Sequence, residues 1–284
     1  MRIRISQQAA YAYSPAARSI IQVLRLTPRS FEAQYVSRWR IATDVDCALR
    51  QSEDSLGNIV HSFSHPGPIE HIEVTAEGEI ETFDTVGVVR GSIEPLPPEI
   101  YLRAAALAEA NGALREFADA ATAGQREPLE RLHPLMGAIH EAMTFAPAAT
   151  PATTSAAEAF ALRNGVGRDF AHVFIACARW LGMPARYVSG YLAPPNGELR
   201  DGEDAGHAWA ESYVAGLGWV AFDAANDTCA DERYVRVAVG FDYQSAAPVR
   251  AARSGFGGET LSMSLRIGQA HRQGQSQSQS QSQG

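Results

Sequence analysis

The hydrophobic residues of this chain change their spacing near residue 95, and this change limits the folds open to it. Before that point, apolar and polar residues alternate in short segments rich in β-branched side chains, as strands do. Beyond it, Ala- and Leu-rich segments with helical spacing are followed by further strands. This order predicts an α+β protein: an N-terminal antiparallel β-sandwich-like domain, then helices packed on an antiparallel sheet.

The first 95 residues contain six predicted strands. They are bounded by turn residues, at Pro28, Gly57-Asn58, Pro66-Gly67 and Gly78. The predicted strands are RIRIS at 2–6, IIQVLRLTP at 20–28, QYVSRWRIA at 34–42, NIVHSFSH at 58–65, HIEVTAEGEIETFD at 71–84 and VGVV at 86–89. A Pro-rich stretch at 92–99 then indicates a linker.

The second half mixes helices and strands. Ser155 and Glu158 form the pattern of a capping box that opens a short helix, and Asn164-Gly165 is expected to end it. The predicted helices are 99–124, 128–145, 156–163 and 168–181, and the predicted strands are 185–192, a hairpin within 207–226, 234–243 and 260–267.

These patterns divide the chain into four parts. A β-rich N-terminal domain covers 1–95, a helical connecting region covers 96–152, and a core with C-terminal strands covers 153–268. Residues 269–284 end in a Gln-Ser repeat, which cannot bury apolar surface and is expected to be a disordered, inert tail.

Charge and cysteine content exclude several classes of protein. The formal net charge is −8, whereas a nucleic-acid-binding protein needs a basic face. Three separated cysteines without CxxC spacing indicate neither a disulfide framework nor a zinc site, and His61, His65 and His71 lack further ligands at familiar spacing. No apolar run has signal-peptide or membrane-span length, so we expect a soluble, cytoplasmic protein without metal, cofactor, nucleic-acid or membrane partner.

Three short motifs in the second half carry the chemistry. They are NGVGRDFAH at 164–172, His207 in GHAWAE and Asp223 in GWVAFDAAN. His207 begins one predicted strand and Asp223 ends the next, so a hairpin can bring them together. An imidazole oriented by a carboxylate is the base half of a nucleophilic triad, and the nucleophile belongs at a helix N-terminus.

These motifs resemble the bacterial transglutaminase-like proteins of the papain-related cysteine peptidase superfamily. In that family the loop typically reads G-V-C-[RQ]-D-[FY]-A-H, followed by LGIPARYVSGY, HAWAE and GW.GFDPTN. This chain has GVGRDFAH, LGMPARYVSGY, HAWAE and GWVAFDAAN, and the N-terminal segments YAYSP and LRLTPR also resemble the family. The resemblance implies a cysteine-type acyltransferase or amidase with His207 as base and Asp223 as its orienting residue.

Gly167 departs from this pattern at the position of the catalytic cysteine. Glycine has no side chain that could attack a carbonyl. Cys177 lies ten residues further along the helix, roughly 15 Å away at 1.5 Å per residue, and its spacing predicts a core thiol. Cys229 would need a large loop rearrangement to substitute, and Cys47 lies in the other domain.

Several neighbouring residues are candidates for the cleft. Asp169, Tyr191 and Trp209 are the candidate substrate-binding residues, although Asp169 fits a helix N-terminal charge better than a catalytic acid, and Tyr191 and Trp209 fit plain core as well as cleft walls. His172 fits either the cleft or a buried, hydrogen-bonded position. The polar run GELRDGEDAG at 197–206 fits either a solvated loop over the cleft or a substrate-selecting lid.

Three functional hypotheses follow. The first is an acyltransferase or amidase acting on peptide or protein amides of the glutamine type, impaired by Gly167. The second is a pseudoenzyme that binds a peptide or partner through the retained cleft. The third is an engineered knockout or a sequence change of an active protein, with Gly in place of Cys. Designed knockouts more often use Ala or Ser at such a position. The chain has no lysine, so it could not cross-link itself through lysines of its own. The sequence leaves the oligomeric state and the choice between cross-linking and hydrolysis open.

Overall fold

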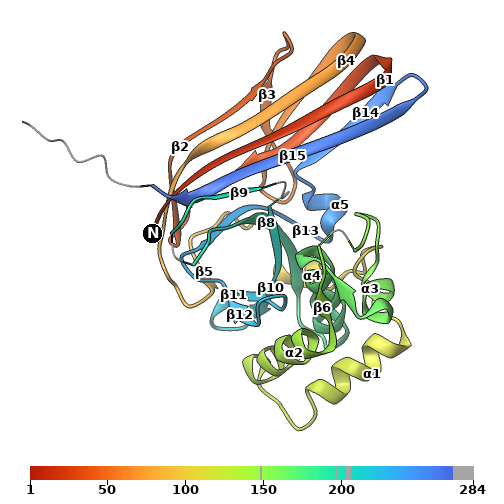
Figure 1. Cartoon of the computed structure of the whole chain (residues 1–284). Coiled ribbons are helices and arrows are strands. Elements are labelled where there is room, and N and C mark those ends of the chain that lie inside the picture. Colours follow the sequence, from red (N-terminus) through yellow and green to blue (C-terminus); the bar gives the residue numbers. More distant parts are fainter. Residues whose placement is uncertain (148, 196, 203–205, 271–284) are drawn as a thin grey trace, which may run out of the picture.

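The computed structural model describes residues 1–147, 149–195, 197–202 and 206–270. It is a mixed α+β fold made of two antiparallel sheets and a group of helices, as the sequence predicts. The long strands of the first sheet cover one side of the molecule, and the helices lie at the opposite end with the second sheet between them (Figure 1). Among the described residues, no helix has the length and apolar character needed to cross a bilayer.

The first sheet has seven strands built around two long ones, β1 and β4, which pair along most of their length. Both halves of β1 contribute to one apolar core, because Tyr11 and Leu24 belong to the same buried cluster. The strands predicted within 2–84 to form a β-sandwich-like domain thus belong to one antiparallel sheet. Its strands are β1 (Arg2–Thr27), β2 (Gln34–Thr43), β3 (Arg50–Glu53), β4 (Ile59–Thr82), β9 (Arg200–Gly202), β14 (Val249–Ser254) and β15 (Gly258–Gln269).

Two of the predicted turns lie inside β4 instead of ending it. A Cβ at Gly67 would come 2.2 Å from the carbonyl oxygen of Ala17, and one at Gly78 would come 2.3 Å from that of Arg38. A register shift interrupts the pairing of β1 and β4 at Gly67, and a shift in β2 lies opposite Glu79 and Ile80, next to Gly78. These glycines therefore serve close cross-strand approaches at bulges, and the segments predicted as separate strands join into β1 and β4.

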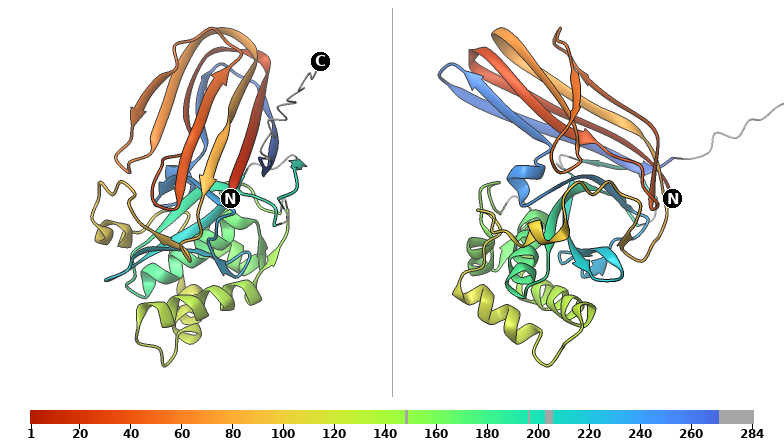
Figure 2. Two further views of the ribbon diagram at one scale, coloured as in Figure 1. Left: turned by 90° about the vertical axis from the view of Figure 1, so that its left-hand side faces the viewer. Right: turned by 180° about the vertical axis from the view of Figure 1, so that it is seen from behind.

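The C-terminal strands also differ from the prediction, which assigned them to the core. β14 pairs with β1 from Ser19 to Leu24, and β15 pairs with β1 from Ile3 to Ser14. In Figures 1 and 2 these blue strands lie beside the red β1. The local alternation of a strand specifies its buried face but not its partner, and here the partner is the first strand of the chain.

The second sheet has six strands in the order β12-β11-β10-β8-β13, with β5 beside β11. Its centre matches the strands predicted at 185–192 and 207–226. The strands are β5 (Val88–Val89), β8 (Ala185–Leu192), β10 (His207–Val214), β11 (Gly218–Asp223), β12 (Thr228–Cys229) and β13 (Tyr234–Gly240).

The helices pack on one face of this sheet around α4, which is buried along most of its length. The segment predicted as one helix at 99–124 contains only the short 3-10 helix η1 and α1. The capping box of Ser155 and Glu158 opens α3 as predicted, but the left-handed residue at its end is Arg163. The elements are η1 (Pro98–Leu102), α1 (Gly112–Ala121), α2 (Pro128–Ala142), α3 (Ala156–Leu162), α4 (Gly167–Trp180) and α5 (Tyr243–Ala246), with β6 (Thr144–Phe145) pairing in parallel with β7 (Asn164–Gly165).

The tail predicted to be disordered from residue 269 begins later than expected, because Gln269 still belongs to β15 and pairs with Ile3. Its Gln-Ser repeat lies outside the described residues, from 271 onward.

Candidate active site

Gly167 is the first residue of α4, and a buried carboxylate holds the loop in front of it. Asp169 accepts a hydrogen bond from the backbone N–H of Val166 at 2.8 Å and another from the hydroxyl of Thr150. A Cβ at Gly165 would come 2.7 Å from the Cβ of Asp169, so the loop needs glycine there. The sequence around position 167 therefore builds a defined helix start.

His207 and Asp223 meet across the hairpin of β10 and β11. The Nε2 atom of His207 lies 2.6 Å from Oδ2 of Asp223. This contact directs the other ring nitrogen toward the start of α4: a Cβ built on Gly167 would lie 3.1 Å from Nδ1 and from Cε1 of His207. The structure thus brings together the three positions that the sequence singled out.

Asp223 is buried and receives several hydrogen bonds besides that of His207. The side chains of Asn226 and Tyr234 donate to Oδ2 at 2.7 and 2.8 Å, and the backbone N–H of Ala225 donates to Oδ1 at 3.0 Å. Burial by itself would raise the pKa of this carboxyl, but the hydrogen bonds and the His207 ring outweigh burial and hold its pKa below the usual value. The carboxylate therefore stays ionised and orients the imidazole.

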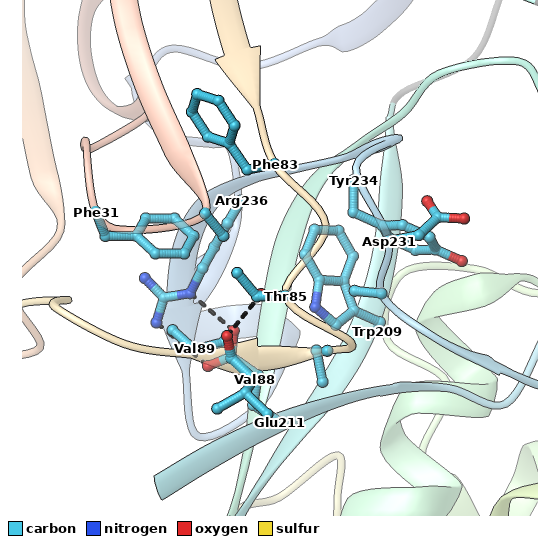
Figure 3. Close-up of a pocket in the computed structure, with 14 residues that line it drawn as sticks. Phe31, Phe83, Thr85, Val88, Val89, Trp209, Glu211, Asp231, Tyr234 and Arg236 are labelled. Carbon is cyan, nitrogen blue, oxygen red and sulfur yellow. Dashed lines mark hydrogen bonds and ion pairs between the residues drawn. The ribbon is translucent and has the colours of Figure 1, made fainter. Parts of the chain in front are cut away.

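Aromatic side chains support His207 laterally. The ring of Trp209 stacks at a centroid distance of 6.2 Å, and that of Tyr234 lies 6.0 Å away. A Cβ at Gly190 would come 2.7 Å from the Trp209 ring, so glycine on β8 makes room for it. Trp209 also lines a small cavity of about 30 Å³ together with Phe31 and others (Figure 3).

A buried ion network lies beside this cavity. Glu211 on β10 is fully buried and bonds Arg186 at 2.7 Å and Arg236 at 2.8 Å, the latter shown in Figure 3. Arg186 also bonds Glu94 of the linker that joins the two halves of the chain. Burial would raise the pKa of Glu211, but the two arginines outweigh burial and lower it. This network fixes β8, β10 and β13 behind the His207–Asp223 pair.

Gly167 and His207 open into a cleft of about 390 Å³. Its near wall belongs to the second sheet and the start of α4. Its far wall comes from the N-terminal sheet, so the C-terminal strands that return to β1 also shape the site. The far-wall residues are Tyr11, Val249, Leu261 and Met263.

The three candidate substrate-binding residues lie outside this cleft, which corrects that prediction. Asp169 is buried as the cap of α4, and Trp209 packs behind His207. Tyr191 is buried against the N-terminal sheet, where its hydroxyl lies 2.6 Å from Oε1 of Gln7. These positions match the alternatives that the sequence left open, a charge at the helix start for Asp169 and core for Tyr191 and Trp209, whereas their contact partners do not follow from the local sequence.

His172 is buried and hydrogen-bonded, the second of the two positions that its sequence allowed. Its Nε2 accepts the backbone N–H of Tyr243 at 3.0 Å, and burial lowers its pKa to about 3. It is a neutral hydrogen-bond acceptor that ties α4 to α5.

The three cysteines are free, and none takes the nucleophile position. Cys177 is fully buried among the helices, where burial raises its pKa to about 12. Cys229 is partly buried on β12 and its pKa is raised as well. Within the described ranges, no group of three or more His, Cys, Asp or Glu side chains could hold a metal ion.

The sequence reasoning missed two supports of Asp223. Asn226 follows it by three residues, and short polar side chains at such spacing often bond back to a neighbouring carboxylate or backbone. That spacing could have found Asn226, whereas Tyr234 reaches Asp223 from a separate strand.

Comparison with known proteins matches both halves of the chain to family models. Residues 3–81 match the bacterial transglutaminase-like N-terminal region, and residues 115–224 match the core of the transglutaminase-like superfamily. Uncharacterized proteins of Mycobacterium tuberculosis and Mycobacterium bovis are 30% identical over 282 residues, covering 88% of this chain and 86% of theirs. An uncharacterized protein of Mycobacterium leprae is 28% identical over 286 residues, covering 94% of this chain and 98% of its own.

A solved structure supports the fold over nearly the whole chain. The crystal structure of a candidate cysteine protease from Cytophaga hutchinsonii superimposes with a TM-score of 0.74 at 20% identity, covering 94% of this chain and 90% of that one. The two family models give the family, and the superposition supports the fold. The chain belongs to the bacterial transglutaminase-like proteins, which share a papain-related α+β fold.

Proposed function

We propose that this chain carries the base half of a cysteine-type acyl-transfer or amidase site and, with glycine at position 167, binds a peptide or protein amide without turning it over by thiol chemistry. The observation that carries the proposal is the direction of the imidazole. Its Nε2 is held by Asp223, and its Nδ1 lies 3.1 Å from where a side chain at 167 would begin. A thiol at that point would meet the base that a nucleophilic triad requires.

The nucleophile side also supports this proposal. Gly167 has an ordinary helical backbone at the first position of α4, so a residue with a side chain can adopt it. A Cβ there is tight against His207 and against the carbonyl oxygen of Ala208 at 3.2 Å, and a shift of a few tenths of an ångström would accommodate it. A thiolate at a helix N-terminus would also be stabilised by the first free N–H groups.

The lining of the cleft favours neutral or acidic substrates with apolar flanks. The described lining residues include Arg168 and Arg200 but no carboxylate. Leu261 and Phe145 at the rim are about half exposed, at 46% and 51%. We expect a peptide carboxamide flanked by an apolar residue to bind in preference to one flanked by lysine.

The test compares the unmodified chain with Gly167→Cys. We expect Gly167→Cys to release ammonia or amine from a glutamine-containing peptide, on the order of 10³-fold or more above the parent, because loss of a triad nucleophile removes most triad-dependent rate. We expect the parent to bind the same peptide, measured by calorimetry, without consuming it.

Two variants control this test. Gly167→Ala adds the same Cβ without a thiol and should stay inactive toward amides, and His207→Gln in the Gly167→Cys background should remove the gained turnover. A folded Gly167→Cys protein that neither turns over nor binds peptide amides would contradict the proposal.

A further inference from the structure

The imidazole of His207 is poised as a base without a thiol in front of it. Nε2 is engaged by Asp223, and within the described part of the chain Nδ1 has no hydrogen-bond partner. The ring is mostly buried, with 14% of its side chain exposed, and it opens on the cleft. A held imidazole with one accessible nitrogen can take a proton from whatever molecule lies beside it.

The space beside Gly167 suits a water molecule. The point where a Cβ would lie is 3.1 Å from Nδ1 of His207 and 3.2 Å from the carbonyl oxygen of Ala208. A water seated just outside that point can donate one proton to each of these two acceptors. Its lone pairs then face the cleft, whose volume of about 390 Å³ far exceeds the ~10–15 Å³ that one water requires.

We propose that a water molecule beside Gly167 takes the place of the thiol, and that His207 and Asp223 use it to hydrolyse activated acyl bonds, namely esters and thioesters. This inference rests on the roles that the proposed function gives to His207 and Asp223. It adds an activity that the unmodified chain performs with its own residues.

The reaction balances with water alone. The water oxygen forms a bond to the acyl carbon while one of its protons moves to Nδ1 of His207. The bond from that carbon to the ester oxygen or thioester sulfur then breaks, and the proton on Nδ1 passes to the departing group. The products are a carboxylic acid and an alcohol or thiol, and Asp223 stabilises the imidazolium between the two steps.

The choice of acyl bond follows from the leaving group. An amide nitrogen leaves poorly, and direct attack by water forgoes the two easier steps of a covalent intermediate. Ester and thioester leaving groups are far weaker bases, so one positioned general base can suffice. The far wall of Tyr11, Val249, Leu261 and Met263 is largely apolar, which favours an uncharged, aliphatic acyl group.

The experiment measures hydrolysis of p-nitrophenyl acetate and p-nitrophenyl butyrate by the unmodified chain. We expect His207→Gln to lower the protein-dependent rate on the order of 100-fold, the low end of what a positioned general base contributes. His71→Gln is the matched control, since His71 lies 3.8 Å from Asp44 on the N-terminal sheet, far more exposed at 54%. The control should leave the rate unchanged.

A second variant keeps the test independent of folding effects at His207. Gly167→Ala should also lower the rate, because its Cβ would crowd the water beside Nδ1. The parent should show no burst, and its intact mass during turnover should show no acyl adduct.

Any of three results would overturn this inference. They are equal rates for the parent and a folded His207→Gln, an unchanged rate in Gly167→Ala, and an acylated protein. Its failure is distinguishable from that of the proposed function. If Gly167→Cys turns over amides while the parent shows no His207-dependent esterolysis, the water inference falls and the proposed function stands.

Discussion

The proposed catalytic site has a base side, formed by His207 and Asp223, and a nucleophile side at the start of α4, and the two differ in the groups they supply. On the base side, Asp223 retains hydrogen bonds from His207, Asn226 and Tyr234, and the buried Glu211 network supports the strands behind it. On the nucleophile side, the cap of Asp169 keeps the helix start in place, but position 167 offers no reactive atom. Packing maintains a site's geometry through many contacts, whereas its chemistry can depend on a single side chain.

The largest expected effect tests whether the base side still works. In the Gly167→Cys background, Asp223→Asn should lower amide turnover by roughly 10³–10⁴-fold, because the imidazole loses the carboxylate that fixes its tautomer and stabilises its charge. Steady-state kinetics check this, with circular dichroism to confirm folding. Asn226→Ala, which removes one of several donors to the same carboxylate, should cost far less. Equal losses for both would mean that Asp223 acts only as a structural acceptor.

The next effect concerns the support behind the base side. Glu211→Ala should lower the free energy of unfolding by about 3–5 kcal/mol, because it leaves Arg186 buried with one of its charge partners removed. Urea denaturation measures it. Glu79→Ala is the matched control: Glu79 also pairs with arginines, but those partners are 44–64% exposed and can be solvated. A cost at Glu211 no larger than at Glu79 would contradict the importance of this buried network.

A smaller effect tests the nucleophile side. Asp169→Ala should lower the free energy of unfolding by about 1–2 kcal/mol, because the N–H of Val166 and the hydroxyl of Thr150 lose their buried acceptor. Thermal unfolding of this variant should be compared with Glu158→Ala, which removes the capping box of α3 in an exposed position. We expect the smaller loss for Glu158→Ala. A larger loss of stability for Glu158→Ala than for Asp169→Ala would show that the contacts of Asp169 contribute little to the helix start at Gly167.

The smallest effect is a pH dependence from Asp223. Because its pKa is lower in the folded state than in the unfolded chain, its ionised form stabilises the protein above the unfolded value of about 3.9, and this stability is lost as pH falls through the lowered folded value. The difference in melting temperature between the parent and Asp223→Asn should therefore shrink between pH 6 and pH 3. A difference that stays constant over this range would contradict the ionised, hydrogen-bonded Asp223.

Patterns of neighbouring residues predicted the helix and strands that hold the candidate site, but they predicted the strand pairing of the sheets around it less well. The hairpin of β10 and β11 and the start of α4 follow from alternation, helical spacing and turn residues close in sequence. By contrast, Gly67 and Gly78 were interpreted as turns although they serve bulges, because the backbone that approaches them belongs to distant strands. The return of β15 to β1 is likewise a long-range pairing, and it decides which residues form the far wall of the cleft.

Some candidate site residues could be predicted from the local sequence, and others depend on distant packing partners. His207 and Asp223 were predictable because a hairpin joins the ends of adjacent strands. Trp209 and Tyr191 alternate within their strands as either core or cleft residues would, so only their packing partners, His207 and the N-terminal sheet, settle their place.

The central claim is that Nδ1 of His207 is directed at position 167 as a working base. The most direct measurement is the rate at which iodoacetamide alkylates Gly167→Cys, followed by mass spectrometry from pH 5 to 9, with and without His207→Gln. The account predicts rapid labelling at position 167 below pH 7 that slows by at least about tenfold when His207 is replaced, because the imidazole stabilises the thiolate. Cys177, buried in the helical core, should stay unlabelled in both proteins. Equal labelling of Cys at 167 with and without His207 would contradict the account.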